Sequence, residues 1–210
     1  MKKSGFTLSE LIIALGIVGV IAAITAPMIT SIVPDKDKVN TLNAYKLIQD
    51  TSKEILRDPS LYHCNGDTSA NILTCNEKPF DVPDAYISKM TSSYSRKFPV
   101  LFAWKLGVNA DDMTWNSSKG MTFKTNDGTY WEINCNSSSG ATFVLDFNGT
   151  NEGKNCSYHK TSCQKPDRFT FELGIDGMTV QGKDNLTKAY IKNPFKLNDK
   201  KEDYKTAKSL

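Results

Sequence analysis

The sequence has little net charge and few residues of the kinds that most often carry catalysis. Its 26 Lys and Arg residues stand against 23 Asp and Glu residues, a formal net charge of +3 in 210 residues. This balance excludes a strongly basic field of the kind that holds nucleic acid. The histidines are only His63 and His159, and no serine or cysteine lies in a recognisable nucleophile motif. We therefore expect no nucleic-acid partner and no enzymatic activity.

Charge is absent altogether from one long stretch near the start of the chain. The 23 residues from Leu11 to Val33 include no acidic or basic side chain. At about 1.5 Å rise per residue such a helix is roughly 35 Å long, enough to cross a hydrocarbon core of about 30 Å. A secretory signal peptide has a shorter apolar core and a cleavage site with small residues. The run predicts a membrane-spanning helix, with Lys2 and Lys3 on the cytoplasmic side.

Small residues recur three or four positions apart inside this apolar run. Gly16, Gly19, Ala22 and Ala23 share a helix face on which another helix can approach closely. Pro27 removes one backbone donor and predicts a bend beyond that face. The run therefore has features that favour helix association as well as residence in lipid.

The segment KSGFTLSELIIALGIVGVIAAITAP resembles the N-terminal signal of type IV pilins and type II secretion pseudopilins. It has a basic leader that ends in Gly5, followed by Phe6, a carboxylate at Glu10 and an apolar helix. The resemblance implies that a membrane aspartic peptidase, the prepilin peptidase, cuts between Gly5 and Phe6 and methylates the new N-terminal residue. It also implies that Glu10 pairs with the N-terminal amine of a neighbouring subunit during assembly.

This resemblance predicts a structural subunit of a type IV pilus or a type II secretion pseudopilus. Such a subunit is held in the bacterial inner membrane with its C-terminal domain outside the cytoplasm, and is assembled into a periplasmic or extracellular filament. Its expected partners are the peptidase, other pilin or pseudopilin subunits, the inner-membrane assembly platform and the lipid bilayer. One alternative is a minor pilin that presents an adhesive or DNA-binding surface at a filament tip. Another is a membrane-anchored enzyme that uses the same export route.

With this signal in place, the sequence divides into five segments. The amphipathic segment carries apolar residues at helical spacing, and Asp58-Pro59 ends it. The last segment is polar and rich in lysine, and we expect a loosely packed or mobile tail. The segments are a leader peptide (1–5), a transmembrane and assembly helix (6–34), an amphipathic continuation of that helix (35–57), a globular domain (58–182) and the polar tail (183–210).

Strand patterns fill the second half of the globular segment. MTFKT and TYWEIN flank the turn Asn126-Asp127-Gly128 and predict a hairpin, and ATFVLDF, RFTFEL and MTVQ continue the strand pattern. We expect an α+β fold in which a long N-terminal helix, membrane-spanning in its first half, packs on a small antiparallel sheet of four or five strands, as in pilins. Before the strands we expect short helices or apolar connecting segments, whose core residues are Phe98, Leu101, Phe102 and Trp104.

The cysteines all lie beyond the apolar run, on the side where this topology permits disulfides. They are Cys64, Cys75, Cys135, Cys156 and Cys163. We expect Cys64 and Cys75 to close a small loop, and Cys156 to pair with Cys135 or Cys163, which leaves one cysteine over. A zinc site that includes His159 is the alternative, but the second half of a zinc-ribbon spacing is missing.

Oxygen-bearing side chains surround a glycine turn between residues 146 and 153. Asp146, Asn148 and Asn151, with Asp167 further along, offer the ligands that calcium prefers. A turn held by Asx hydrogen bonds explains the same residues. The segment resembles a D-x-N-G, then G-x-D-x-F pattern of some pseudopilin-like proteins, with Pro166 in place of the expected glycine. Because related major pseudopilins bind calcium in a loop of this region, calcium is the one cofactor to consider.

Overall fold

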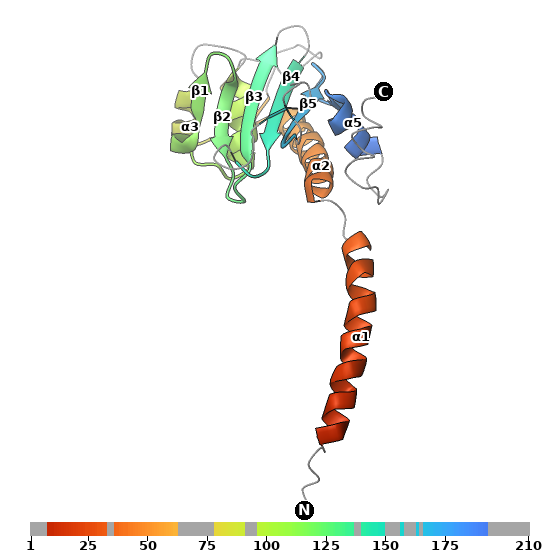
Figure 1. Cartoon of the computed structure of the whole chain (residues 1–210). Helices are drawn as coiled ribbons and strands as arrows, with labels where there is room; N and C mark the ends of the chain where they lie inside the picture. The colour runs from red at the N-terminus through yellow and green to blue at the C-terminus, as the bar shows by residue number, and fades with distance from the viewer. Residues whose placement is uncertain are drawn as a thin grey trace, which may run out of the picture.

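The computed structural model describes residues 8–32, 36–62, 78–90, 96–136, 140–149, 156–157, 163 and 166–192. Figure 1 shows helix α1 (Leu8–Ile32) leading away from a globular part that contains the other helices and the strands. Within α1 the side chains described are those of Leu8, Ser9, residues 11–20 and Ala23. Among the described residues, no helix is both long and apolar enough to span a membrane.

Helix α2 (Lys36–Arg57) follows α1 and packs on the globular part. Its buried positions recur three or four residues apart and include Ala44, Ile48 and Ile55. The helix ends where the sequence predicts an end, because the Asp58 carboxylate accepts hydrogen bonds from the Ser60 amide at 2.9 Å and the Ser60 hydroxyl at 2.6 Å. These bonds favour a turn over a further helical turn. Residues 33–35, between the two helices, lie outside the described residues.

The sheet is antiparallel, with six strands that neighbour one another in chain order. The sequence predicted four or five strands, and the strand it missed is a three-residue edge strand at the start of the sheet. The predicted turn at Asn126-Asp127-Gly128 joins the second and third strands. The strands are β1 (Thr114–Asn116), β2 (Gly120–Lys124), β3 (Tyr130–Asn136), β4 (Gly140–Asp146), β5 (Arg168–Leu173) and β6 (Val180–Gly182).

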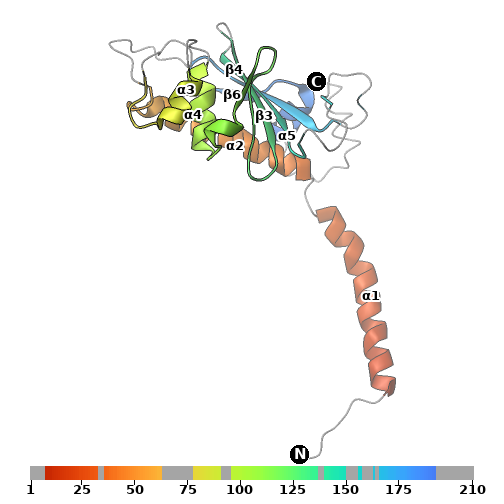
Figure 2. The ribbon, with the colours of Figure 1, turned by 90° about the vertical axis from the view of Figure 1, so that its left-hand side faces the viewer.

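Helices cover one face of this sheet (Figure 2). Helix α4 (Lys97–Lys105) supplies Phe98 and Phe102, both fully buried, to the centre of the core. The ring of Phe102 lies 5.1 Å from that of Phe143 on β4 and 5.8 Å from that of Trp131 on β3, between ring centroids. The predicted α+β arrangement is therefore present, and α4 joins α2 in covering the sheet. The short helix α3 (Asp84–Lys89) and the short 3-10 helix η2 (Ala110–Asp112) flank α4 in the chain.

The predicted polar tail is wrong over its first residues, because helix α5 (Asn185–Lys192) packs on the sheet edge and on α2. The Asp184 carboxylate caps α5 by accepting hydrogen bonds from the Thr187 amide at 2.8 Å and its hydroxyl at 2.7 Å. Leu186 and Tyr190 on one side of the helix are buried in the core. Residues 193–210 lie outside the described residues.

Candidate functional site

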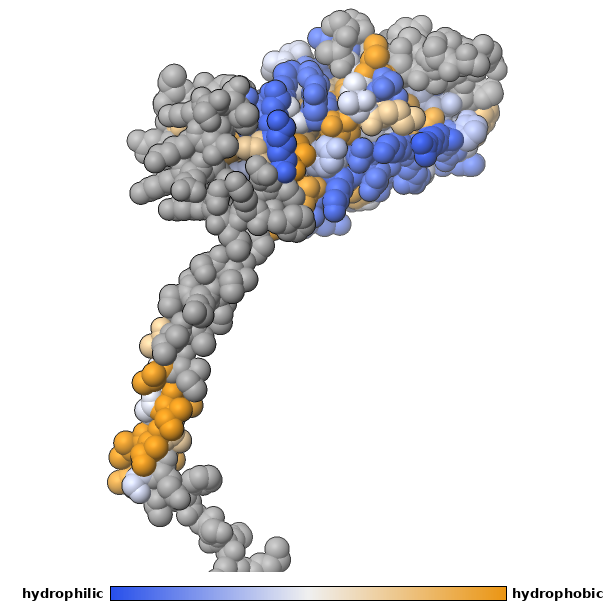
Figure 3. Space-filling model, turned by 90° about the vertical axis from the view of Figure 1, so that its right-hand side faces the viewer, coloured by the Kyte–Doolittle hydropathy of each residue, from blue (hydrophilic) through white to orange (hydrophobic). Residues whose placement is uncertain are grey.

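The first candidate site is the apolar surface of α1. Large apolar side chains at eight positions between Leu8 and Val20 are 51–77% exposed. In Figure 3 the visible described part of α1 is largely apolar, whereas hydrophilic residues dominate the visible described surface of the globular part. An exposed apolar surface of this kind marks a membrane or protein contact, because water solvates it poorly. Helix α1 is therefore built to be covered by something other than water.

The residues of the predicted processing and assembly site lie, in the sequence, just before α1 and in its first turn. Gly5 and Phe6 lie outside the described residues, and Glu10 lies within α1 with its side chain outside them. Further along, Gly16 and Gly19 face open space: a Cβ atom built at either position meets nothing within 4 Å. This surface leaves room for the backbone of another helix to approach.

The second candidate site lies at the edge of the sheet face that the helices leave open. Glu132 is 7% exposed and pairs there with two cations. Its Oε1 atom accepts a hydrogen bond from Nη2 of Arg168 and lies 3.1 Å from Nζ of Lys119. Asp146 is directly opposite Arg168 in the pairing of β4 and β5. A buried carboxylate and a charged network therefore meet at the end of these strands.

Asp146 is the residue of this site whose buried side chain lacks hydrogen-bond partners. It is 1% exposed, and neither carboxylate oxygen has a hydrogen-bond partner. Burial raises the pKa of Asp146 to about 6, and the nearby charge of Asp167 raises it further, while the amides of Asn148 and Gly149 and the charge of Arg168 offset part of the shift. A buried carboxylate without partners is costly, and a cation is the simplest group that would satisfy it.

The residues predicted to bind calcium are brought together only in part. Asp146 and Asp167 are close enough for their charges to interact, and Asn148 is exposed in the turn that follows β4. Asn151 lies outside the described residues, and within the described residues no group of three or more His, Cys, Asp or Glu side chains could hold a metal. The described donors fit an oxygen-ligand site that would need backbone carbonyls or water to complete it. The Asx alternative stays open, because the backbone amides of Asn148 and Gly149 lower the pKa of Asp146, although neither carboxylate oxygen has a partner within hydrogen-bond geometry.

Asp167 is held in place by the segment that carries Cys156. One of its carboxylate oxygens accepts a hydrogen bond from the Cys156 amide at 2.7 Å, and its own amide donates to the Cys156 carbonyl at 3.2 Å. Cys156 is in turn linked to Cys163 by a disulfide. This link is one of the two pairings that the sequence predicted for Cys156. The disulfide loop therefore positions Asp167 beside the end of β4.

Of the other predicted cysteines, the structure describes only Cys135. Cys135 on β3 is free, and burial raises the pKa of its thiol to about 12. Such a thiol stays protonated and is a poor nucleophile and a poor metal ligand. The zinc alternative is also weakened, because the sulfur atoms of Cys156 and Cys163 are joined to each other. Cys64, Cys75 and His159 lie outside the described residues.

Comparison with known proteins identifies only the N-terminal segment. Residues 1–26 match the family model described as the prokaryotic N-terminal methylation motif. This motif is the prepilin signal of type IV pilins and pseudopilins, so the resemblance noted in the sequence is confirmed. No curated protein and no solved structure matches the chain. The match therefore supports a pilin-like or pseudopilin-like structural protein, which implies processing by prepilin peptidase and assembly with other subunits.

Proposed function

We propose that the chain is a subunit of a type IV pilus or a type II secretion pseudopilus, cleaved between Gly5 and Phe6, methylated, and polymerised through α1. The observation that carries this proposal is the joint presence of the methylation motif at residues 1–26 and the exposed apolar surface of α1 that follows it. Before assembly, lipid covers α1 in the inner membrane and the globular part lies outside the cytoplasm. After assembly, the helices of other subunits replace the lipid.

Glu10 has a defined role in this exchange. Insertion scales put the cost of a charged side chain at about 2.5 to 3.5 kcal/mol at a bilayer centre, with a lower cost near the interface. An ion pair in the filament relieves that cost, and the N-terminal amine of Phe6 in a neighbouring subunit is the cation that cleavage creates. The pair forms only between subunits, so it favours the polymer over the stored monomer.

The experiment compares Glu10→Ala and Glu10→Asp with the parent, each expressed as the full chain with its assembly machinery. Processing is measured by intact mass, and filament content is measured in sheared fractions. Glu10→Ala removes only a charge that lipid disfavours, so its insertion and cleavage are expected to be normal and its filament content low. Glu10→Asp keeps the charge and is expected to retain part of the assembly. Assembly of Glu10→Ala at the parent's level would contradict the role of the ion pair.

A second activity, calcium binding at the end of β4, is favoured by the unpartnered carboxylate of Asp146. Asp146 and Asp167 would hold the ion, with Asn148 and Asn151 as further candidate ligands. The ion would neutralise two carboxylates that now repel each other, and so would stabilise the turn after β4. This activity is compatible with a major or a minor subunit, and it would act on stability rather than on catalysis.

The rival function is a minor pilin with an adhesive or DNA-binding surface at a filament tip. The lysines that the sequence offers for a basic surface include Lys160 and Lys165, which lie outside the described residues, whereas Arg168 is engaged by Glu132. Salt-dependent retention of the purified chain on DNA, compared before and after removal of residues 193–210, separates this rival from a plain subunit.

A further inference from the structure

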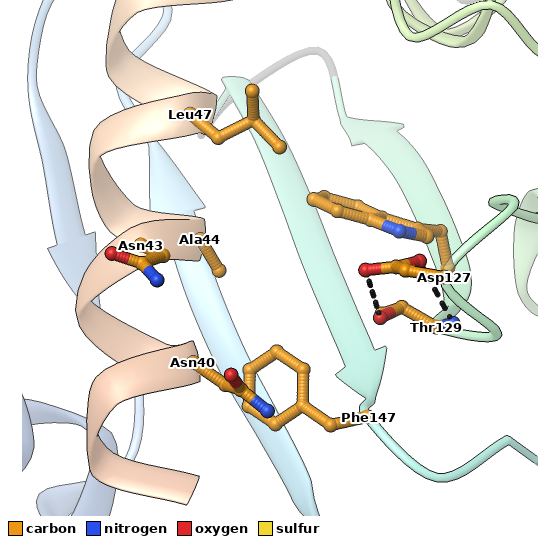
Figure 4. Close-up of a pocket in the computed structure, with 8 residues that line it drawn as sticks. Asn40, Asn43, Ala44, Leu47, Asp127, Thr129 and Phe147 are labelled. Carbon is orange, nitrogen blue, oxygen red and sulfur yellow. Dashed lines mark hydrogen bonds between the residues drawn. The ribbon is translucent and has the colours of Figure 1, made fainter. Parts of the chain in front are cut away.

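The described residues of the globular part form a groove beside α2 and a pocket on the face of the sheet that the helices leave open. The groove encloses about 270 Å³ (Figure 4). Its wall opposite α2 is half polar, and there the Thr129 hydroxyl donates a hydrogen bond to the Asp127 carboxylate at 3.0 Å. Nothing in the described residues shows what covers this groove. The pocket, by contrast, is lined by groups that together define the chemistry of a ligand.

The pocket encloses about 310 Å³ above strands β3 and β4. Ligand sites commonly enclose about 300 to 1,000 Å³, so this one suits a small ligand. Among the described residues that line it, only Val144 is apolar. The others carry hydroxyl, amide, carboxylate or ammonium groups and are Ser118, Lys119, Glu132, Asn134, Asn136, Thr142 and Lys183. The lining therefore favours a polar ligand over a lipid chain or an aliphatic side chain.

Lys119 reaches the pocket because the β1–β2 turn lies directly against β3. Oδ1 of Asn116 holds this turn by accepting hydrogen bonds from the Ser118 amide at 2.9 Å and the Ser118 hydroxyl at 2.8 Å. Gly120 follows with φ of 78°, and a Cβ atom there would lie 2.2 Å from a backbone carbonyl oxygen of β3. Glycine permits this close approach. As a result, Nζ of Lys119 lies 3.1 Å from Oε1 of Glu132 on β3.

Lys183 approaches the pocket from the segment between β6 and α5. Its Nζ atom lies 3.3 Å from Oγ1 of Thr142 on β4 and 3.5 Å from Oε1 of Glu172 on β5. Glu172 also accepts a hydrogen bond from the side-chain amide of Gln181 at 3.3 Å. Because β2 and β6 lie on opposite sides of β3 and β4 in the sheet, Lys119 and Lys183 flank the pocket from opposite sides.

The charges at the pocket favour an anion. Glu132 is the one acid among its described lining residues, and it already pairs with Arg168 and Lys119. The side chains of Lys119 and Lys183 are 42% and 47% exposed, and an ammonium group has three donors, so each can also donate to a ligand. Two lysines against one glutamate leave one positive charge, and including Arg168 and Glu172 does not change this excess. One carboxylate matches it better than a phosphate group with nearly two charges.

We infer that this pocket binds a hexuronate, a sugar acid that carries one carboxylate among several hydroxyl groups. The carboxylate lies between the ammonium groups of Lys119 and Lys183. The exposed amide of Asn134 offers a donor and an acceptor to the sugar hydroxyls, and the Thr142 hydroxyl, which accepts from Lys183, still has its own proton to donate. A free sugar acid and a uronate residue of a polysaccharide share this chemistry. The inference concerns the globular part and does not depend on the proposed polymerisation.

The test measures binding of methyl β-D-glucuronoside to the full chain in a detergent without sugar groups, by saturation-transfer NMR titration. Methyl β-D-glucoside lacks the carboxylate and acetate lacks the hydroxyls, so these two compounds are the controls. We expect a dissociation constant on the order of 1 mM for the glucuronoside. Both controls are expected to bind at least about tenfold more weakly. Equal affinity for acetate would show recognition of charge alone, and equal affinity for the glucoside would show recognition of hydroxyls alone; either result would overturn the inference.

Three variants locate the site. Lys183→Gln is expected to weaken glucuronoside binding about tenfold and to leave glucoside binding unchanged. Asn134→Ala, at an exposed position, is expected to weaken binding of both sugars several-fold. Lys188→Gln is the matched control, since Lys188 is an exposed lysine of α5 that does not line the pocket. Urea unfolding shows that each variant is folded, and Asn134→Ala decides the matter if Lys183→Gln is not.

The result of these variants is decisive in either direction. Glucuronoside binding that is the same in Lys183→Gln, Asn134→Ala and Lys188→Gln, or no binding to the parent, would overturn the inference. Retention of the parent on immobilised polyglucuronate, with release by the methyl glucuronoside, would assign the site to a polysaccharide. Binding of the glucuronoside without such retention would assign it to a free sugar acid.

Discussion

Asp146 on β4 and Arg168 on β5 are paired across the sheet, yet the Arg168 guanidinium donates to Glu132 and leaves both carboxylate oxygens of Asp146 without a hydrogen bond. Cross-strand partners of opposite charge ordinarily stabilise each other. Here the cation is engaged by another acid, and Asp167 adds a second negative charge near Asp146. The end of β4 is therefore a place where a carboxylate is buried at a cost to stability.

The first prediction concerns the pH dependence of stability in the presence of a calcium chelator. Burial raises the pKa of Asp146 from its ordinary value of 3.8 to about 6. The folded chain thus binds more protons than the unfolded chain between these values, so the contribution of Asp146 to stability is fully present below pH 4 and is lost as pH rises through 6. The loss of unfolding free energy is at most about 3 kcal/mol, because the two pKa values differ by roughly two and each pKa unit corresponds to about 1.36 kcal/mol.

Asp146→Asn tests this directly in the detergent-solubilised full chain. The variant is expected to be more stable than the parent at pH 7.5, and the difference between the two is expected to shrink as pH falls toward 4. Urea unfolding at several pH values measures both. A difference that stays constant with pH would show that Asp146 does not titrate in this range.

The second prediction is that calcium raises the melting temperature of the parent chain. Stabilisation of about 2.7 kcal/mol is expected when calcium is at 100 times its dissociation constant. Asp146→Ala is expected to abolish the shift. Asp176→Ala is the matched control, since Asp176 is an exposed turn residue of the β5–β6 connection that accepts a hydrogen bond from the Met178 amide at 3.0 Å. No shift in the parent, or an equal shift in Asp146→Ala, would remove the proposed site.

The third prediction concerns the cysteines outside and inside the described residues. Mass mapping of unreduced peptides is expected to find Cys64 linked to Cys75 in addition to the Cys156–Cys163 disulfide. Cys135 is expected to react with an alkylating reagent much more slowly in the folded chain than after unfolding, because its thiol is half-buried against the core and protonated. Alkylation of Cys64 and Cys75 in the folded chain without reductant would contradict their pairing.

The fourth prediction compares two glycines with positive φ. At Gly140, which begins β4 with φ of 93°, a Cβ atom would lie 2.2 Å from the Leu173 carbonyl oxygen. At Gly107, with φ of 74°, a Cβ atom would meet nothing within 4 Å. Gly107→Ala should cost about 1 to 2 kcal/mol for the backbone conformation alone, and Gly140→Ala several kcal/mol more, since the β4–β5 pairing must shift. Equal urea midpoints for the two variants would contradict the close approach at Gly140.

Much of the sheet could be predicted because its signals are local. The Asn126-Asp127-Gly128 turn and the alternation of Phe169 and Phe171 with polar residues specify a hairpin and a strand within a few residues. β1 could not be found this way, because three residues are too few for a pattern and it is held by pairing with β2. Helix α5 was missed for a related reason: eight residues do not form a stable helix alone, and this one depends on the Asp184 cap and on packing against α2.

The candidate sites likewise differ in whether their signals are local in the sequence. The processing motif at residues 1–26 is contiguous, so the sequence identifies it directly. The burial of Asp146 and the hydrogen bond from the Cys156 amide to Asp167 depend on how strands distant in the chain are packed, and no spacing rule predicts them. The groove beside α2 joins residues from α2, the β2–β3 hairpin and the turn after β4, and it becomes visible only in the folded chain.

The central claim, that this chain is a processed and polymerising subunit, is tested most directly by the intact mass of the chain recovered from sheared filaments of cells that carry the matching machinery. The expected mass lacks residues 1–5 and includes one added methyl group, and the N-terminal peptide begins at a methylated Phe6. A full-length, unmethylated chain confined to the membrane fraction, with none in the filaments, would contradict the claim.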